Sequence, residues 1–120
     1  MKLNHLHINV PNVKKAQDFY QNFFNFKVEF EHGDGVFLKD DVGFLLAIDP
    51  LQDNEAVDFP KWFHFGFCLE SAKEVKDLYE KMKEDGVEFT RDYKEFGKDA
   101  ANFYCRAPGS YNLEVTWNRD

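Results

Sequence analysis

Three side chains of the metal-binding type stand out in this sequence: His5, His64 and Glu114. Two neutral imidazoles and one carboxylate form a ligand set that suits a divalent transition metal and leaves coordination positions open for water or substrate. A single strand histidine is more often an ordinary polar residue than a ligand. The hypothesis therefore depends on elements that bring the three side chains together.

A repeat along the chain supports the pairing of the two histidines. His64, Tyr79 and Glu88 each follow a residue of the same type by 59 positions, and those residues are His5, Tyr20 and Glu29. The chain is therefore read as a duplicated unit. Histidines at equivalent positions of two copies favour a shared site more strongly than either does alone.

The first copy begins with a strand over residues 2–10, where apolar and polar side chains alternate and place His5 and His7 on the polar side. An amphipathic helix follows, with Asn12 as its N-cap and Asn25 as a left-handed stop. Three β-rich runs come next, at residues 27–31, 36–39 and 43–48. The order is βαβββ.

The second copy repeats this order. Residues 62–69 alternate like the first strand, Ser71 and Glu74 form a capping-box signature, and Gly86 marks the helix stop. The remaining strands are expected at residues 87–90, 102–106 and 112–117, with a polar insert at residues 91–99. We therefore expect an α+β fold of two tandem βαβββ modules that form a curled mixed-sheet cleft.

The expected organisation is a single domain over residues 1–120. Module one covers about 1–50, a linker about 51–61 and module two about 62–120, and the irregular segment at residues 49–61 joins the halves. The first and last strands of the modules would make the floor of the cleft. Glu114 shares the polar side of its strand with Asn112 and Thr116, so it could converge there with His5 and His64.

Composition excludes several functions. The formal charge of −7 argues against phosphate neutralisation, so we expect no nucleic-acid partner. No apolar run resembles a signal peptide or a membrane span, and two cysteines are too few for a disulfide scaffold, so we expect a cytoplasmic protein without a membrane partner. Fourteen phenylalanines can build a core or line an apolar cavity for a small molecule.

The sequence resembles the vicinal oxygen chelate superfamily, which includes glyoxalases, fosfomycin-resistance thiol transferases, extradiol dioxygenases and metal-free bleomycin-resistance proteins. The matching features are Asn4-His5 with Val10, Phe19-Tyr20 with Phe26, His64 with Phe67, and Pro108 six residues before Glu114. The resemblance implies His5, His64 and Glu114 as ligands of a divalent Mn, Fe, Ni or Zn ion. It also implies a homodimer with a site shared between chains.

Departures from the family pattern narrow this reading. Aligning the last strands of the two halves sets Leu46 opposite Glu114, where glyoxalases usually carry a fourth, acidic ligand. The family's acidic turn reads Ala107-Pro108-Gly109-Ser110 here, and residues 91–103 lack the histidine of extradiol dioxygenases. The chain ends at Asp120, before the C-terminal arginine of the fosfomycin enzymes. The resemblance thus implies a three-ligand site and leaves the general base unassigned.

For the remaining candidate residues we compare a functional role with an ordinary structural one. Tyr104 is similar to a substrate-contacting tyrosine of the fosfomycin enzymes and is a catalytic or substrate-contact candidate beside Glu114, although packing is the common role of such tyrosines. His7 is a candidate for contact with substrate or with groups behind the ligands, or a cavity-rim residue. Cys68 is expected in the core, and His32 on the surface.

Two functions of different class follow. The first is a metal-dependent enzyme, a lyase, thiol transferase or dioxygenase, acting on a small molecule whose adjacent oxygens chelate the ion. The second is a metal-free protein of the bleomycin-resistance type that sequesters a small molecule in an aromatic cleft. The phenylalanine-rich composition fits both.

Overall fold

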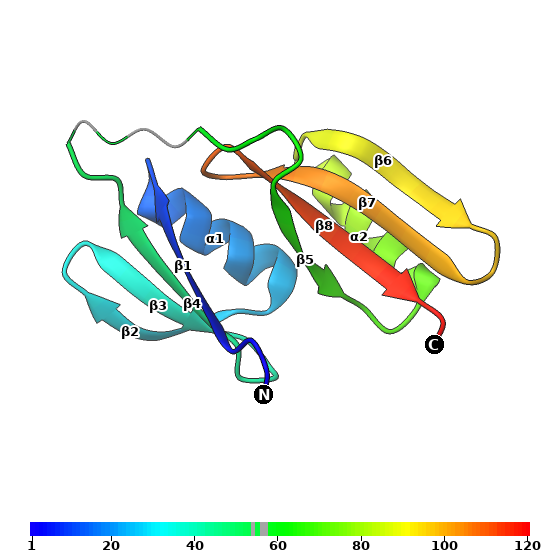
Figure 1. Cartoon of the computed structure of the whole chain (residues 1–120), viewed down its shortest axis with the longest axis horizontal. Coiled ribbons are helices and arrows are strands. Elements are labelled where there is room, and N and C mark those ends of the chain that lie inside the picture. Colours follow the sequence, from blue (N-terminus) through cyan, green and yellow to red (C-terminus); the bar gives the residue numbers. More distant parts are fainter. Residues whose placement is uncertain (54, 56–57) are drawn as a thin grey trace. The chain divides into compact units, whose positions relative to one another are not determined.

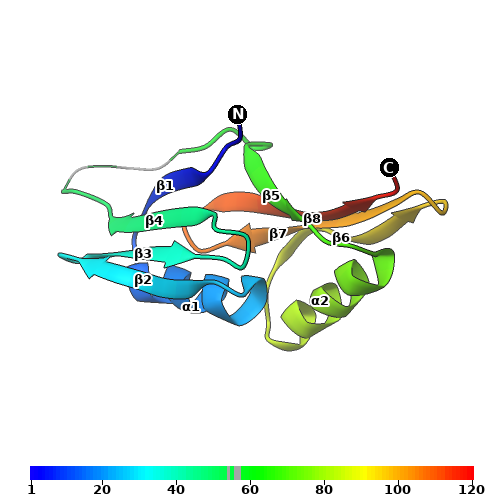
Figure 2. The ribbon, with the colours of Figure 1, turned by 90° about the horizontal axis from the view of Figure 1, so that it is seen from below.

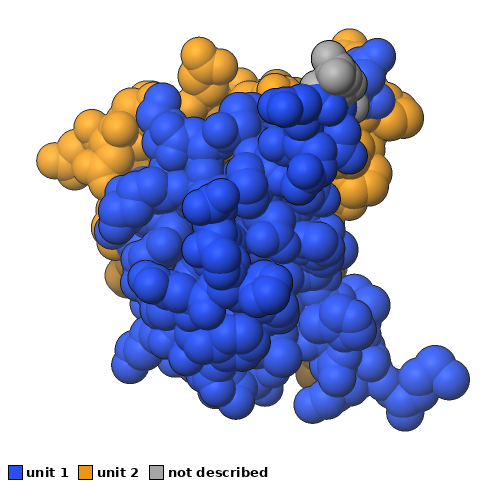
Figure 3. All heavy atoms as spheres, turned by 90° about the vertical axis from the view of Figure 1, so that its left-hand side faces the viewer, with its two compact units in different colours: residues 1–58 blue, residues 59–120 orange. Residues whose placement is uncertain are grey.

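The computed structural model describes residues 1–53, 55 and 58–120. Residues 54, 56 and 57 belong to the predicted linker and lie outside the described residues. Residues 1–58 and residues 59–120 each form a compact unit, here unit 1 and unit 2 (Figure 3). Within the described ranges, no helix is long and apolar enough to cross a membrane.

Unit 1 contains one helix and a four-stranded sheet (Figure 1). In chain order the elements are β1 (His5–Val10), α1 (Val13–Phe24), β2 (Lys27–His32), β3 (Gly35–Lys39) and β4 (Leu45–Pro50). The strands lie in the order β1-β4-β3-β2; β1 runs parallel to β4 and the other pairs are antiparallel. The predicted βαβββ order of the first half is confirmed.

Unit 2 has the same order and topology. Its elements are β5 (His64–Cys68), α2 (Ala72–Glu84), β6 (Phe89–Phe96), β7 (Ala100–Ala107) and β8 (Tyr111–Asn118). The strands lie in the order β5-β8-β7-β6, again with the first and last strands parallel. The predicted α+β fold of two βαβββ modules is therefore confirmed, and neither sheet closes into a barrel. The cleft and the single domain stay predictions.

Local signals set the ends of both helices. The Asn12 side chain accepts a hydrogen bond from the Lys15 amide at 3.0 Å, and Asn25 adopts the left-handed conformation after α1 (φ 58°). Ser71 caps α2 through the Glu74 amide at 3.1 Å. The carboxylate of Glu74 accepts from the backbone of Glu70, one residue before the predicted capping-box partner.

The predicted insert at residues 91–99 is wrong, because most of it belongs to a strand. β6 extends to Phe96 and forms a hairpin with β7, with Gly97 in the left-handed region of the turn (φ 62°). Charged side chains suggested a loop, but β6 is an edge strand of its sheet. Edge strands tolerate charged side chains because one edge and much of the surface face solvent.

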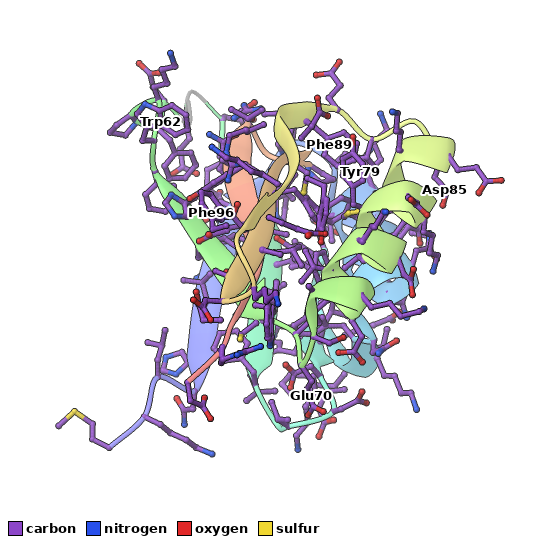
Figure 4. The ribbon with its side chains drawn as sticks, turned by 90° about the vertical axis from the view of Figure 1, so that its right-hand side faces the viewer. Trp62, Glu70, Tyr79, Asp85, Phe89 and Phe96 are labelled. Atoms are coloured by element: carbon purple, nitrogen blue, oxygen red, sulfur yellow. The ribbon has the colours of Figure 1, made fainter. Side chains whose placement is uncertain are left out.

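Each helix covers one face of its own sheet (Figure 2). Phe103, Leu113 and Val115 are fully buried on the side of α2, where Tyr79 packs on Phe103 with ring centroids 5.5 Å apart. Figure 4 shows Tyr79 and Phe89 between the sheet and α2, and Phe96 on the opposite side of the strands. Burying each such side chain contributes about 1.5–3 kcal/mol, which fixes the faces of the strands.

Candidate metal centre

His64 and Glu114 lie together in unit 2. They project from the parallel neighbours β5 and β8 on the face away from α2, with His64 Nε2 3.6 Å from Glu114 Oε1. Their side chains are 33% and 21% exposed. We call this surface the polar face; it carries His64, Asn102, Tyr104 and Glu114. Two of the three predicted ligands are therefore close enough to contact one ion.

A glycine makes room for Glu114. Gly66 is paired with Glu114 across β5 and β8, and a Cβ atom on Gly66 would lie 2.6 Å from the Glu114 carbonyl oxygen and 3.0 Å from its Cβ. Sequence reasoning missed this role. The signal was a glycine inside a strand, which often marks a close approach of another group.

A backbone hydrogen bond fixes the proton on His64. The Nδ1 atom lies 2.9 Å from the carbonyl oxygen of Trp62. A carbonyl only accepts, so Nδ1 carries a hydrogen, and in the neutral imidazole the lone pair is then on Nε2, the atom that lies 3.6 Å from Glu114. This is how metal-ligating histidines are commonly held.

Asn112 ties the start of β5 to β8. It is 2% exposed, and its amide donates to the Lys61 carbonyl at 3.0 Å. Its oxygen accepts from Thr90 Oγ1 at 2.6 Å and from Arg106 Nη1 at 3.0 Å. The bonds from Thr90 and Arg106 hold the amide in place, and the bond to Lys61 fixes the backbone just before His64, so Asn112 helps to position that histidine. The alternation along the strand predicts the face on which Asn112 lies but not these hydrogen bonds.

Asn102 contacts Glu114, and Arg91 contacts Asn102. Glu114 Oε2 accepts from Asn102 Nδ2 at 2.9 Å, and Asn102 Oδ1 accepts from Arg91 Nη2. Both residues lie on strands of the hairpin β6–β7. Arg91 and Asn102 were not predicted as site residues, since their contacts depend on the β6–β7 register.

Tyr104 lies beside both candidate ligands. Its ring meets the His64 ring edge-on at a centroid distance of 5.1 Å, and Tyr104 is paired with Glu114 across β7 and β8. Burial raises the pKa of Tyr104, and the Glu114 charge raises it further. The phenol is therefore protonated at neutral pH, and its hydrogen bond to the Glu114 carboxylate also raises the pKa. Its catalytic and substrate-contact roles stay predictions.

The third predicted ligand, His5, is exposed in unit 1. Its Nδ1 lies 2.7 Å from the side-chain oxygen of Asn4. An amide oxygen accepts, so His5 has its hydrogen on Nδ1 and its lone pair on Nε2, the same tautomer as His64. In both histidines of the repeat, a hydrogen bond from Nδ1 to an oxygen thus sets the orientation of the ring.

His7 forms a pair that the sequence did not indicate. Its Nε2 lies 2.7 Å from Asp49 Oδ2, and the two side chains are 53% and 28% exposed. A Cβ atom on Gly35 would lie within 2.0 Å of Asp49 Oδ1, so the glycine leaves space for this carboxylate. The predicted substrate or supporting role of His7 stays a prediction.

Cys68 was expected in the core, but it is exposed. It shares a side of β5 with His64, and α2 covers the other side. The buried thiol is Cys105, on the α2 side of β7. His32 is exposed, as expected.

Comparison with known proteins decides the family. A model of the Glyoxalase/Bleomycin resistance protein/Dioxygenase superfamily matches residues 2–115. The chain belongs to this superfamily. The resemblance inferred from the sequence is confirmed, and no curated protein matches the sequence significantly.

Solved structures of superfamily members agree in fold. A possible glyoxalase from Bacillus cereus is 30% identical, covers 96% of this chain and 97% of its own, and has a TM-score of 0.81. A superfamily protein from Alicyclobacillus acidocaldarius is 25% identical, covers 99% of this chain and 92% of its own, and has a TM-score of 0.72. A lactoylglutathione lyase from Agrobacterium tumefaciens is 17% identical, covers 97% of this chain and 92% of its own, and has a TM-score of 0.76. At this identity the likeness supports the fold alone.

The strand register corrects the comparison with glyoxalases of this superfamily. Glu114 is paired with Gly66, two residues after His64, and Ala47 is paired with His7, two residues after His5. Ala47, not Leu46, is therefore the counterpart of Glu114. Leu46 is fully buried and points to the α1 side. Alanine has no metal-binding atom either, so no fourth ligand occupies this position.

The residues present fit a divalent metal of the kind superfamily members use. The predicted ligands are divided between the units, with His5 in unit 1 and His64 and Glu114 in unit 2. In the part of the chain that the structure describes, no group of three or more His, Cys, Asp or Glu side chains meets the geometry of a metal site. The fit rests on the donor chemistry: the Nε2 atom of an imidazole that donates through Nδ1 lies 3.6 Å from a carboxylate oxygen in unit 2.

Proposed function

We propose that this superfamily member is a metal-dependent enzyme acting on a small molecule with adjacent oxygen atoms. His5, His64 and Glu114 would hold a divalent Mn, Fe, Ni or Zn ion. The observation that carries the proposal is the His64–Glu114 pair, in which Nδ1 is bound to the Trp62 carbonyl and Nε2 faces Glu114 at 3.6 Å. Lyase, thiol transferase and dioxygenase chemistry all fit this donor set.

The chain's own residues would divide the work as follows. A bound divalent ion supplies Lewis-acid polarisation of the substrate oxygens. His64 keeps its lone pair on Nε2 because the Trp62 carbonyl holds the proton on Nδ1. Tyr104, protonated at neutral pH, would exchange its hydrogen bond to Glu114 for one to a substrate oxygen. Preorganised donors of this kind stabilise negative charge that develops on oxygen.

Metal titration of the purified chain tests the proposal. The expected result is saturable binding of Mn²⁺, Fe²⁺, Ni²⁺ or Zn²⁺ by calorimetry, and Glu114→Gln should lower the affinity at least about 10-fold. Glu84→Gln, at the exposed end of α2, removes the same charge elsewhere and should leave binding unchanged. Less than about a tenth of an equivalent bound with all four metals would refute the proposal.

A metal-free binding protein is the second candidate, and one observation favours it. Phe30 and Phe37 stack at 4.4 Å with an interplanar angle of 17°, and Phe30 is 50% exposed. Phe37 is paired with Ala47, so the stack lies on the His7 side of the unit 1 sheet. An exposed aromatic stack offers a face to a planar apolar ligand.

Binding of the aromatic dye 1-anilinonaphthalene-8-sulfonate in the presence of a chelator separates the two functions. A sequestering protein should bind the dye tightly without metal, and Phe30→Ala should weaken that binding, whereas Phe96→Ala in unit 2 should not. Absence of dye binding in the presence of the chelator would count against the sequestering function and favour the enzyme instead.

We also propose that two copies associate as a homodimer that shares the site, as the superfamily resemblance implies. Sedimentation velocity should give a mass of two chains. A monomer that still binds metal stoichiometrically would contradict the shared site.

A further inference from the structure

Asn102 connects Glu114 to an arginine. It donates to Glu114 Oε2 through Nδ2 at 2.9 Å and accepts from Arg91 Nη2 through Oδ1. A guanidinium can only donate and a carboxylate can only accept. The orientation of the Asn102 amide is therefore set by its two neighbours, and the three side chains form a chain of hydrogen bonds with one direction.

Aromatic rings hold the guanidinium of Arg91. Its central carbon lies 5.3 Å from the centroid of Tyr104 and 5.7 Å from that of Phe96. Nη1 is buried and has no hydrogen-bond partner among the residues described, whereas Nη2 binds Asn102. Contacts with ring faces stabilise a buried guanidinium nitrogen. Arg91 is thus a fixed cation that donates to Asn102 through Nη2.

The equivalent positions of unit 1 show that the hydrogen bonds from Arg91 through Asn102 accompany the carboxylate of Glu114. By strand register, Ala47 takes the place of Glu114 and Phe37 that of Tyr104. Phe30, paired with Phe37, takes the place of Arg91. Gly35, two residues before Phe37, takes the place of Asn102. Unit 1 has no carboxylate at the position of Glu114. At the positions of Tyr104, Arg91 and Asn102 it has two phenylalanines and a glycine, so the polar partners are missing as well.

We propose that Arg91 and Asn102 are positioning residues that orient Glu114 for metal binding. With Oε2 accepting from Asn102, Oε1 is the Glu114 oxygen that lies 3.6 Å from His64 Nε2. Arg91 acts through Asn102, because it keeps the amide NH₂ directed at the carboxylate. The inference rests on the proposed function and adds to it the residues that fix how the glutamate binds.

Cobalt provides the test, because Co²⁺ reports its ligands through its visible spectrum. The nearly isosteric Asn102→Leu removes both hydrogen bonds and keeps the volume, and Arg91→Met removes the donor behind Asn102. Each should weaken Co²⁺ binding about 10-fold and alter the visible absorption bands. Because the two residues act in series, the double variant should bind little worse than either single variant.

Lys94→Met is the matched control. Lys94 is paired with Asn102 across β6 and β7, and its Nζ lies 4.9 Å from the Phe96 ring. The variant therefore removes one positive charge beside Asn102 while the hydrogen bonds of Asn102 to Arg91 and Glu114 stay in place. Its Co²⁺ affinity and spectrum should match the unsubstituted chain. A general loss of positive charge would instead raise cation affinity in Lys94→Met and Arg91→Met alike.

The outcomes separate the inference from the proposed function. If the unsubstituted chain binds no Co²⁺, both are wrong. If it binds Co²⁺ and Glu114→Gln loses it, but Asn102→Leu stays within about twofold with an unchanged spectrum, only the inference is wrong. Should Asn102→Leu fail to fold, Arg91→Lys decides. That variant keeps the charge but not the planar fork, and it should reproduce the spectral change.

Discussion

Ala47 occupies in unit 1 the position that Glu114 occupies in unit 2. Both residues are paired with the residue two positions after the first-strand histidine, His7 in one case and Gly66 in the other. Both also neighbour an aromatic residue on the next strand, Phe37 or Tyr104. The duplicated sheets are thus alike in backbone and unlike in chemistry at one equivalent position.

The strand register predicts opposite effects on stability for a glutamate at position 47 and at position 46. Ala47→Glu places a carboxylate on the partly exposed face away from α1, so the variant should fold with nearly unchanged stability. Leu46→Glu buries a charge in the α1 side of the sheet and should cost more than about 3 kcal/mol. Urea unfolding measures both. Equal stability of the two variants would contradict the register.

Gly66 should not tolerate a side chain. Gly66→Ala places a methyl group against the Glu114 backbone, and relieving this contact should destabilise unit 2 by about 1–3 kcal/mol. Because the strain falls at Glu114, metal affinity should drop as well. Thermal unfolding with and without metal measures both effects, and Cys68→Ala on the same side of β5 is the control. A stable variant with full metal affinity would show that β5 and β8 can separate at little cost.

The two thiols should differ in reactivity. Burial raises the pKa of Cys105 to about 12, so below that pH the thiol stays protonated and unreactive in the folded chain. Cys68 is exposed. A disulfide reagent at pH 8 should therefore modify one thiol per native chain, and two after denaturation. Removal of the native reaction by Cys68→Ser would assign it, whereas rapid modification of Cys105 would indicate local opening of unit 2.

Short-range signals explain why much of the fold could be predicted. Asn12, Asn25 and Ser71 act on backbone groups within a few residues, so their types were enough to place the helix ends. The step of 59 then identified the repeat and assigned His5 and His64 to equivalent strands. Such signals do not depend on tertiary contacts.

Pairing between distant strands explains what could not be predicted. The counterpart of Glu114 was placed at Leu46, one residue off, because alternation along a single strand does not give the register to its neighbour. The contacts of Arg91 and Asn102 depend likewise on a register shift between β6 and β7. Cys68 was placed in the core because a small apolar residue type says little about which face of β5 α2 covers.

The hydrogen bond from Asn112 to the Lys61 carbonyl has a kinetic consequence. It joins residues 51 positions apart, and the parallel pairing of β5 with β8 around it joins residues 48 positions apart (112 − 64). The helix and the hairpins of unit 2 close much shorter loops, so we expect them to form first during folding, since loop-closure entropy opposes distant pairings. His64 would then reach Glu114 only in the last step, and an interrupted folding reaction would leave a chain with most of its secondary structure and no ligand pair.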